Sequence, residues 1–437
     1  SPLDCTGCGN CADVCPAKGK ALIMMDAEGE IKNQADNWEF AMTVTEKKDI
    51  ISRFTLRGSQ FVRPYLEFNG ACPGCGETPY VRLLTQLFGD RMIISNATGC
   101  SSIWGASAPS TAYSTDASGK GPAWINPLFE DAAEFALGLQ LGVLKNREKL
   151  LTLAQLALDS NLSQEIKNLI IEWMATISNG ELSKVTAAKL LQALQQKGLE
   201  NNKLVQEFLQ YKDYMVKKSV WAIGGDGWAY DIGFGGLDHV IASGKNVNIL
   251  VFDTEVYSNT GGQASKSTPT GAIAQFAAAG KVVKKKDLAG IAMSYGYVYV
   301  AHVAMGANQA QCIKAFAEAE AYDGPSIIIA YAPCINHGIK TGMATAQAEE
   351  KKAVDAGYWH LYRFNPTLKE EGKNPFSLDS KVPNTDEYKN FLMGEVRYNS
   401  LARQNPERAE KLFDTAVENA KDRYDYLTRL TKLYGQD

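Results

Sequence analysis

The first fifteen residues contain four cysteines whose spacing suits an iron–sulfur cluster. They follow the pattern C-x₂-C-x₂-C-x₃-C-P, which is filled by Cys5, Cys8, Cys11, Cys15 and Pro16. The two-residue gaps let the first three sulfurs occupy corners of one [4Fe–4S] cluster, with backbone N–H groups directed at it. A structural zinc site would instead place all four cysteines on a single metal, and the closing proline favours the cluster.

The fourth cysteine of this run indicates a second cluster. In bacterial ferredoxins with two such runs, the fourth cysteine of each run binds the cluster of the other. Cys15 would therefore need a matching run upstream, and the 437 residues contain none. We expect this chain to be the C-terminal portion of a longer polypeptide, with residues 1–26 forming a partial ferredoxin-like module.

Two oxygen-rich turns follow neighbouring apolar runs. The first is Gly224-Gly-Asp-Gly-Trp228, directly after a run that ends at Ile223. Glycines at such a turn let backbone N–H groups approach a phosphate, and Asp226 adds a hard oxygen ligand suited to Mg²⁺. The second turn is Asp253-Thr-Glu-Val-Tyr-Ser-Asn-Thr-Gly-Gly262. Gly-Asp-Gly alone is a weak signal, but the pair of turns predicts a magnesium–diphosphate site.

The other five cysteines separate into two kinds by position. Cys72 and Cys75 precede a helical pattern, Cys100 and Cys334 follow apolar runs, and Cys312 lies inside a helical pattern. The carboxyl ends of parallel strands lie at one edge of a sheet, where the Asp226 turn would also lie. Cys72, Cys75, Cys100 and Cys334 can therefore converge on a further [4Fe–4S] cluster beside the diphosphate. Cys312 is expected to be a small buried hydrophobe.

Short apolar runs alternate with helical patterns in the middle of the chain. The runs are typical of buried parallel strands and lie at 92–95, 220–223, 247–252, 298–300 and 326–331. Helical periodicity lies between them, at 77–88, 232–243 and 308–321. This alternation predicts an α/β fold with a doubly wound parallel sheet of the diphosphate-binding type over 67–340.

The remaining segments frame this sheet. Residues 27–66 have weak periodicity and are interpreted as a connector. Residues 139–218 interrupt the alternation and predict an all-helical insertion, used for packing or subunit contact. Residues 341–437 are expected to form a mainly helical tail.

The composition is that of an ordinary globular protein. Hydrophobic residues make up 45% and charged residues 22%, and the formal net charge is −4. The near balance of charge argues against nucleic-acid binding, and the lack of a long apolar run argues against a membrane span. Clustered cysteines and an opening segment without signal-peptide character indicate a cytoplasmic location.

The two turns resemble those of thiamine-diphosphate enzymes, in which Gly-Asp-Gly is followed further along by Asn. Here Thr254 stands about where the second Mg²⁺ ligand would be, and Asn259 comes later, a departure that fits one subgroup. Cys72-Pro-Gly-Cys-Gly-Glu77 and Asn96-Ala-Thr-Gly-Cys-Ser-Ser-Ile-Trp-Gly105 belong to the same pattern. From Cys5 to about Cys334, the chain resembles pyruvate:ferredoxin oxidoreductase.

The resemblance implies thiamine diphosphate, Mg²⁺ and [4Fe–4S] clusters as cofactors. The thiamine cofactor would contact Glu77, Cys100, Gly225, Asp226, Gly227, Trp228, Thr254, Glu255, Val256, Tyr257, Ser258 and Asn259. Mg²⁺ would be held by Asp226, the Thr254 side chain and the Val256 carbonyl, and Asn259 would be the catalytic residue facing the substrate. The cluster near thiamine would be held by Cys72, Cys75, Cys100 and Cys334. Glu77 could instead serve a helix dipole, and Trp228 could instead be a core aromatic.

The implied reaction is the oxidative decarboxylation of pyruvate with coenzyme A to acetyl-CoA and CO₂. Electrons would pass from thiamine through the clusters to ferredoxin or flavodoxin, in an enzyme expected to be a homodimer. One alternative is another 2-oxo acid oxidoreductase, acting on 2-oxoglutarate, branched-chain or aryl substrates. A second alternative is a non-catalytic iron–sulfur electron-transfer subunit, which would need neither Asp226 nor the Thr254 turn.

Overall fold

The computed structural model describes residues 3–47, 50–107, 110–196 and 198–434. Within them, eight strands form one sheet in the order β2-β1-β3-β4-β6-β5-β7-β8. They are β1 (Met92–Asn96), β2 (Ala123–Ile125), β3 (Ser219–Gly225), β4 (Asn248–Asp253), β5 (Tyr299–Val303), β6 (Ser326–Tyr331), β7 (Tyr362–Phe364) and β8 (Phe376–Leu378). β1 to β6 pair in parallel, and β7 and β8 add antiparallel strands at one end.

The predicted α/β fold with a doubly wound parallel sheet is confirmed. The five apolar runs form β1, β3, β4, β5 and β6, and every residue of β4 and β6 is buried. Such strands are covered on both faces, which is why they read as continuous apolar runs. β2, β7 and β8 were not predicted, because three residues are too few to show a period.

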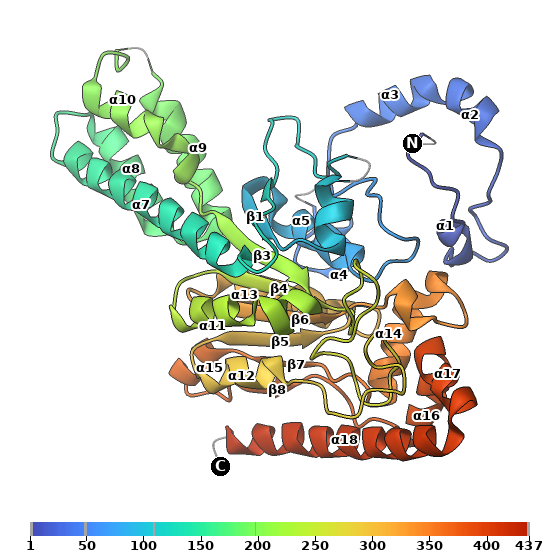
Figure 1. Ribbon diagram of the computed structural model, residues 1–437. Coiled ribbons are helices and arrows are strands. Elements are labelled where there is room, and N and C mark those ends of the chain that lie inside the picture. Colours follow the sequence, from blue (N-terminus) through green and yellow to red (C-terminus); the bar gives the residue numbers. More distant parts are fainter. Residues whose placement is uncertain (1–2, 48–49, 108–109, 197, 435–437) are drawn as a thin grey trace.

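Helices cover both faces of the sheet (Figure 1). α5 (Thr78–Phe88) and α13 (Gln309–Ala321) enclose one core, which includes Trp221 and Leu250. α11 (Phe234–Ala242) and α12 (Leu288–Ser294) enclose the other, which includes Val220 and Ile249. Consecutive strand residues thus face opposite cores, as the pleat of a strand requires.

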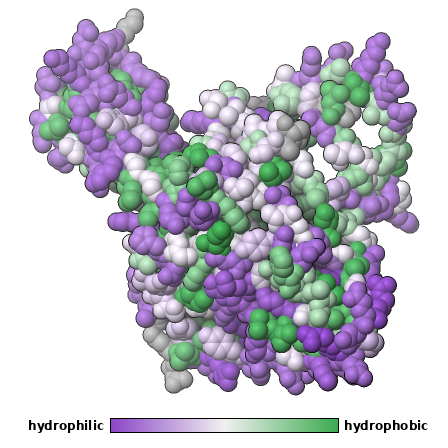
Figure 2. All heavy atoms as spheres, viewed as in Figure 1, coloured by the Kyte–Doolittle hydropathy of each residue, from purple (hydrophilic) through white to green (hydrophobic). Residues whose placement is uncertain are grey.

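The predicted helical insertion lies between β2 and β3. It consists of α7 (Ala132–Leu158), α8 (Gln164–Thr176), α9 (Gly180–Leu194) and α10 (Lys203–Gln210). These helices project away from the sheet, and their visible surface is mostly hydrophilic (Figures 1 and 2). Their far part has its own core around Trp173, whereas the first two turns of α7 pack into the sheet core through Ala132 and Ala136. The helical region therefore begins earlier than the predicted start near residue 139.

The N-terminal segment packs loosely beside the sheet (Figure 1). It contains α1 (Asn10–Asp13), α2 (Ala27–Asn33), α3 (Ala35–Thr43) and α4 (Leu56–Ser59), and in its described part no strand is present before β1. Large apolar side chains such as Trp38, Phe40 and Met42 are exposed on α3. The residues predicted to be a ferredoxin-like module and a connector thus contribute little to the two cores.

The C-terminal stretch is mainly helical, but it also completes the sheet. Its helices are α14 (Ala346–Asp355), α15 (Pro366–Glu370), α16 (Tyr388–Met393), α17 (Val396–Gln404) and α18 (Pro406–Leu433). β7 and β8 lie among them, and α18 packs against the sheet core through Leu427 and Leu430. Among the described residues, no helix has the combination of length and apolar character that a membrane span requires.

Candidate active site

The two oxygen-rich turns meet at the carboxyl edge of the sheet. β3 ends just before Asp226 and β4 just before Thr254, and these two strands are neighbours. The Thr254 hydroxyl lies 2.8 Å from Asp226 Oδ1 and 3.0 Å from the carbonyl oxygen of Val256. The three groups predicted to bind Mg²⁺ are therefore gathered at one point.

The charge around this point favours a cation. Asp226 and Asp253 are both fully buried, and burial together with the neighbouring Asp253 raises the pKa of Asp226 to about 8. Asp226 accepts a hydrogen bond of 2.6 Å from the Ser265 hydroxyl, and Lys285 pairs with Asp253 at 2.8 Å. A divalent cation bound to Asp226 would stabilise its ionised form and offset the cost of burial.

The chemistry of the donors fits magnesium. In the described residues, no three His, Cys, Asp or Glu side chains are arranged as ligands of one metal ion. The gathered donors are instead a carboxylate, a hydroxyl and a backbone carbonyl, and Mg²⁺ keeps waters and substrate phosphates as its remaining ligands. The residues present therefore fit a Mg²⁺–diphosphate pair.

The two glycines beside Asp226 have different surroundings. A Cβ at Gly227 would lie 2.6 Å from the Tyr257 ring, which no real side chain tolerates. A Cβ built at Gly225 would meet only the Phe252 carbonyl oxygen, at 4.0 Å, so this position borders open space. Trp228 is fully buried in the sheet core, and its Nε1 has no hydrogen-bond partner among the described residues. The structure thus favours the core interpretation of Trp228.

Glu255 belongs to the second oxygen-rich turn, residues 253–262, which we call the metal turn. Its side chain is buried and holds this turn in place. Its backbone is in the left-handed region at φ 62°, and its carboxylate is paired with Lys285 at 2.9 Å and Arg397 at 2.8 Å. Burial opposes its ionisation, but these two cations outweigh burial and lower the pKa of Glu255 to about 2. Sequence reasoning missed both partners. Three consecutive lysines at 284–286 are typical of a solvated charged segment, but Lys285 forms ion pairs with the buried Asp253 and Glu255.

We expect Arg397→Leu to destabilise the protein by about 3–5 kcal/mol, because it leaves Glu255 and Glu395 buried without their shared cation. Urea unfolding of the cofactor-free protein measures this loss. Arg403→Leu, an exposed position on the same helix, is the matched control and should change stability by no more than about 0.5 kcal/mol. Equal losses in the two variants would contradict the role given to Arg397.

Four of the cysteines approach one another at the same edge. The loop with Cys72 and Cys75 is tied to the β6 end by a 3.0 Å hydrogen bond from Gly76 N to the Pro333 carbonyl. Burial raises the pKa of Cys100 to about 12 and that of Cys334 to about 11. Each of these two thiols is also close enough to Cys72 for the charges to interact.

Four thiols that approach one another at one edge of the sheet are the kind of ligand set that a [4Fe–4S] cluster requires. The iron would replace the thiol protons that burial otherwise retains. Cys312 is fully buried on α13, so the prediction that it is a core residue is confirmed.

Glu77 and Asn259 lie next to this cysteine group. Glu77 is 3% exposed at the start of α5, and its carboxylate accepts a 2.8 Å hydrogen bond from Trp104 Nε1. Burial raises the pKa of Glu77 to about 7. Asn259 is exposed and its Oδ1 lies 3.9 Å from Cys100 Sγ, while the Ser258 hydroxyl lies 3.3 Å from the same sulfur. The second turn therefore touches both predicted cofactor sites.

The N-terminal run directs backbone amides at sulfur, as its pattern predicts. Gly7 N lies 3.4 Å from Cys5 Sγ, and Ala21 N lies 3.3 Å from Cys15 Sγ. Amides near Cys15 lower the pKa of its thiol and so favour the thiolate that binds iron. Cys5, Cys8 and Cys11 are exposed. These features fit cluster ligation.

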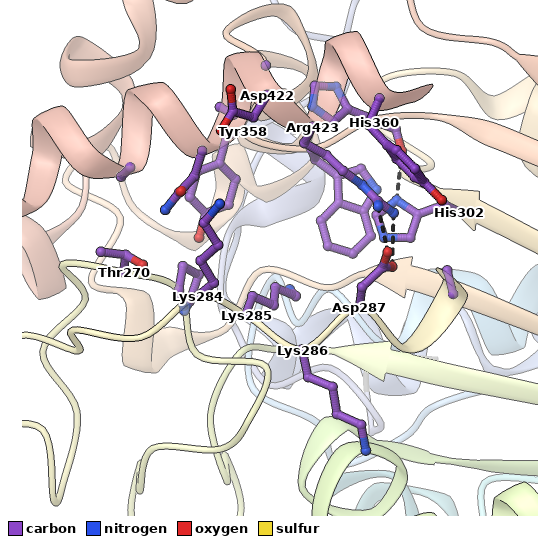
Figure 3. Close-up of a pocket in the computed structure, with 18 of the residues that line it drawn as sticks. Thr270, Lys284, Lys285, Lys286, Asp287, His302, Tyr358, His360, Asp422 and Arg423 are labelled. Carbon is purple, nitrogen blue, oxygen red and sulfur yellow. Dashed lines mark hydrogen bonds and ion pairs between the residues drawn. The ribbon is translucent and has the colours of Figure 1, made fainter. Parts of the chain in front are cut away.

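A cavity of about 370 Å³ lies between the segment 284–287 and helix α18 (Figure 3). Its lining includes Glu255, Lys285, His302, Tyr358 and Arg423. None of the cysteines borders it, and neither Asp226 nor Asn259 does. The cavity is therefore separate from the sheet edge where the cofactors are predicted to bind. The residue of the second turn that lines it is Glu255.

Comparison with known proteins agrees with this geometry. Residues 209–330, which include both turns, match the family described as "Thiamine pyrophosphate enzyme, C-terminal TPP binding domain". The fold and the paired turns therefore define a thiamine-diphosphate-binding domain.

Relatives extend the match to almost the whole chain. It is 57% identical over 99% of its length to pyruvate:ferredoxin oxidoreductase of Moorella thermoacetica, and 55% identical over 98% to pyruvate-flavodoxin oxidoreductase of Klebsiella pneumoniae. The chain spans 37% and 36% of the lengths of these two relatives. The resemblance seen in the sequence is confirmed: the chain corresponds to part of a pyruvate:ferredoxin (flavodoxin) oxidoreductase.

A solved structure also aligns with the chain. It is a 2-oxoglutarate:ferredoxin oxidoreductase from Magnetococcus marinus, with 14% identity and a TM-score of 0.40 over 83% of this chain and 99% of that chain. At that score, the alignment supports no conclusion about the site.

Proposed function

We propose that the complete enzyme containing this chain oxidatively decarboxylates pyruvate with coenzyme A, yielding acetyl-CoA and CO₂. Electrons leave through [4Fe–4S] clusters to ferredoxin or flavodoxin. The observation that carries the proposal is the meeting of Asp226, Thr254 and Val256 at the sheet edge where Cys100 contacts Ser258. Relatives that share nearly all of this chain are named for the same chemistry.

The residues of this chain have distinct tasks in that reaction. Thiamine diphosphate, when bound, supplies the carbon nucleophile and the electron sink. Asp226, the Thr254 hydroxyl and the Val256 carbonyl would hold Mg²⁺, and Gly225, which has no side chain, would let the diphosphate approach the backbone. Glu77, buried and hydrogen-bonded to Trp104, presents a carboxyl group to the cofactor.

The cysteines provide the path for electrons. Cys72, Cys75, Cys100 and Cys334 hold the cluster nearest to thiamine diphosphate, because all four lie at the edge that carries the metal turn. Cys5, Cys8 and Cys11 hold a second cluster, and Cys15 serves a third whose other ligands lie outside these residues. Ferredoxin or flavodoxin accepts the electrons.

A substrate comparison tests the proposal. Purified complete enzyme should reduce ferredoxin or flavodoxin only when a 2-oxo acid and coenzyme A are both present, and pyruvate should give the highest kcat/KM. Preference for 2-oxoglutarate, a branched-chain or an aryl substrate would favour the alternative oxidoreductase. Both kinds of oxidoreductase contain iron and acid-labile sulfide. A thiamine-dependent decarboxylase without redox chemistry would contain neither, so analysis of iron and sulfide separates it from them.

Asn259→Ala should lower turnover by about 100-fold while thiamine diphosphate stays bound, because a neutral amide can hydrogen-bond the substrate without binding the metal. Asn259 is exposed beyond the metal turn and near Cys100, as this role requires. Steady-state kinetics and cofactor titration measure the two effects. Asn146→Ala, a half-buried position on α7 of the helical insertion, is the control. An empty thiamine site with normal turnover in the remaining holoenzyme would contradict the assignment.

We further infer a homodimer, as the family resemblance implies, and a cytoplasmic location, as the clustered cysteines indicate. Light scattering of the complete enzyme gives its mass in solution and tests the dimer. Fractionation of cells that express it tests the location.

A further inference from the structure

His337 connects the two halves of the proposed site. It ends the short 3₁₀ turn Ile335–His337 that follows Cys334, and it is fully buried. Its Nε2 lies 2.7 Å from the backbone carbonyl oxygen of Thr254, and its Nδ1 lies 3.5 Å from the backbone nitrogen of Cys334. One imidazole thus reaches the metal turn on one side and a proposed cluster ligand on the other.

These contacts determine which nitrogen carries the proton. The Cys334 amide can only donate, so Nδ1 accepts, and the Thr254 carbonyl can only accept, so Nε2–H donates. The ring also stacks on Tyr331, with 18° between the planes. Its position is therefore well defined.

The backbone around His337 is fastened on the far side as well. Gly338 has φ 65°, and a Cβ there would lie 2.5 Å from Val396 Cβ. The Gly338 carbonyl accepts a 2.9 Å hydrogen bond from Val396 N, and the Gly394 carbonyl accepts one from Lys340 N at 3.0 Å. The imidazole is therefore carried by a segment that α17 holds in place.

We propose that His337 is a positioning residue that fixes the metal turn relative to the cluster loop, through Thr254 on one side and Cys334 on the other. The proposal rests on the proposed function, which supplies the two cofactors. Electron transfer depends on the spacing between donor and acceptor, so a rigid bridge between their loops has a direct use. The hydrogen bond to Thr254 is short and the one to Cys334 is long. We therefore expect replacement of His337 to affect thiamine diphosphate binding more than the cluster.

Two conservative variants separate the two contacts. The Nε2 of a glutamine can replace the imidazole Nε2 as the donor to Thr254, whereas the Oδ1 of an asparagine can replace Nδ1 as the acceptor for Cys334. In the complete enzyme, His337→Asn should weaken thiamine diphosphate binding about 2- to 10-fold, the range for one neutral hydrogen bond. His337→Gln should bind the cofactor within about twofold of the wild type but alter the electron paramagnetic resonance spectrum of one cluster.

The control is His360→Gln, a buried histidine that packs near Tyr424 on α18, away from both loops. It should leave cofactor affinity and the cluster spectra unchanged. Equal cofactor affinity in the Asn and Gln variants would overturn the proposal, and so would failure of both to fold, because the ring would then be purely structural. A wild-type enzyme without thiamine binding or clusters would instead refute the proposed function itself.

Discussion

Asp226→Asn should weaken the binding of Mg²⁺ and thiamine diphosphate by more than about 100-fold, because it removes the charged metal ligand. Loss of a residue that only supports a metal ligand already costs up to about 100-fold in metal affinity, so loss of the ligand itself should cost more. The fold should survive. An asparagine has nearly the same shape, and its Oδ1 can still accept the hydrogen bond from the Thr254 hydroxyl. Calorimetric titration of the iron-loaded enzyme with Mg²⁺ and thiamine diphosphate measures the loss.

Stability provides a second measurement on the same variant. Asp226 is buried beside Asp253, so without a cation its charge costs folding free energy. The unfolding midpoint of the cofactor-free Asn variant should therefore be no lower than that of the wild type. Asp323→Asn, an exposed carboxylate, is the control and should leave cofactor binding intact. Wild-type affinity in the Asp226 variant would remove the basis of the proposed metal site.

Cys100→Ser should abolish electron delivery to ferredoxin or flavodoxin while thiamine diphosphate still binds. Cys100 lies at the sheet edge beside Ser258 and near the other three cysteines of the proposed cluster, so its loss leaves that cluster one thiolate short. Iron content should fall by the iron of one cluster. Low-temperature electron paramagnetic resonance should lose one signal and keep those of the N-terminal run.

Cys312→Ser is the matched control, since it changes the same atom in a core position. Cys312 is fully buried on α13, away from the edge. The hydroxyl should cost about 1–3 kcal/mol of stability, the usual range for a core change, with every cluster retained. Loss of a cluster from this variant, or its retention in Cys100→Ser, would show that the proposed ligand set is wrong.

Local patterns in the sequence were enough for much of the fold. Strands β1, β3, β4, β5 and β6 were found because strands buried on both faces are continuous apolar runs. The insertion α7–α10 was found because its helices are long enough for their period to appear. β7 and β8 were missed, because three-residue strands leave no periodic signal and join the sheet only through pairing with distant residues.

The sequence also determined which residues could do chemistry. Cysteine spacing and the Gly-Asp-Gly turn are local features, since a few neighbouring residues decide whether a loop can wrap a cluster or admit a phosphate. The order of strands and turns along the chain then indicated that Asp226, Thr254 and the four cysteines share one edge. These inferences required no knowledge of distant contacts.

Only the tertiary structure decided how the site is held. Lys285 looked like part of a solvated run, yet it pairs with Asp253 and Glu255, and Arg397 reaches Glu255 from far along the chain. His337 belongs to none of the sequence motifs described above, yet it bridges Thr254 and Cys334. Charge pairing and buried hydrogen bonds depend on which groups lie within about 3 Å of each other in space. Separation along the chain carries little information about that distance once the chain has folded.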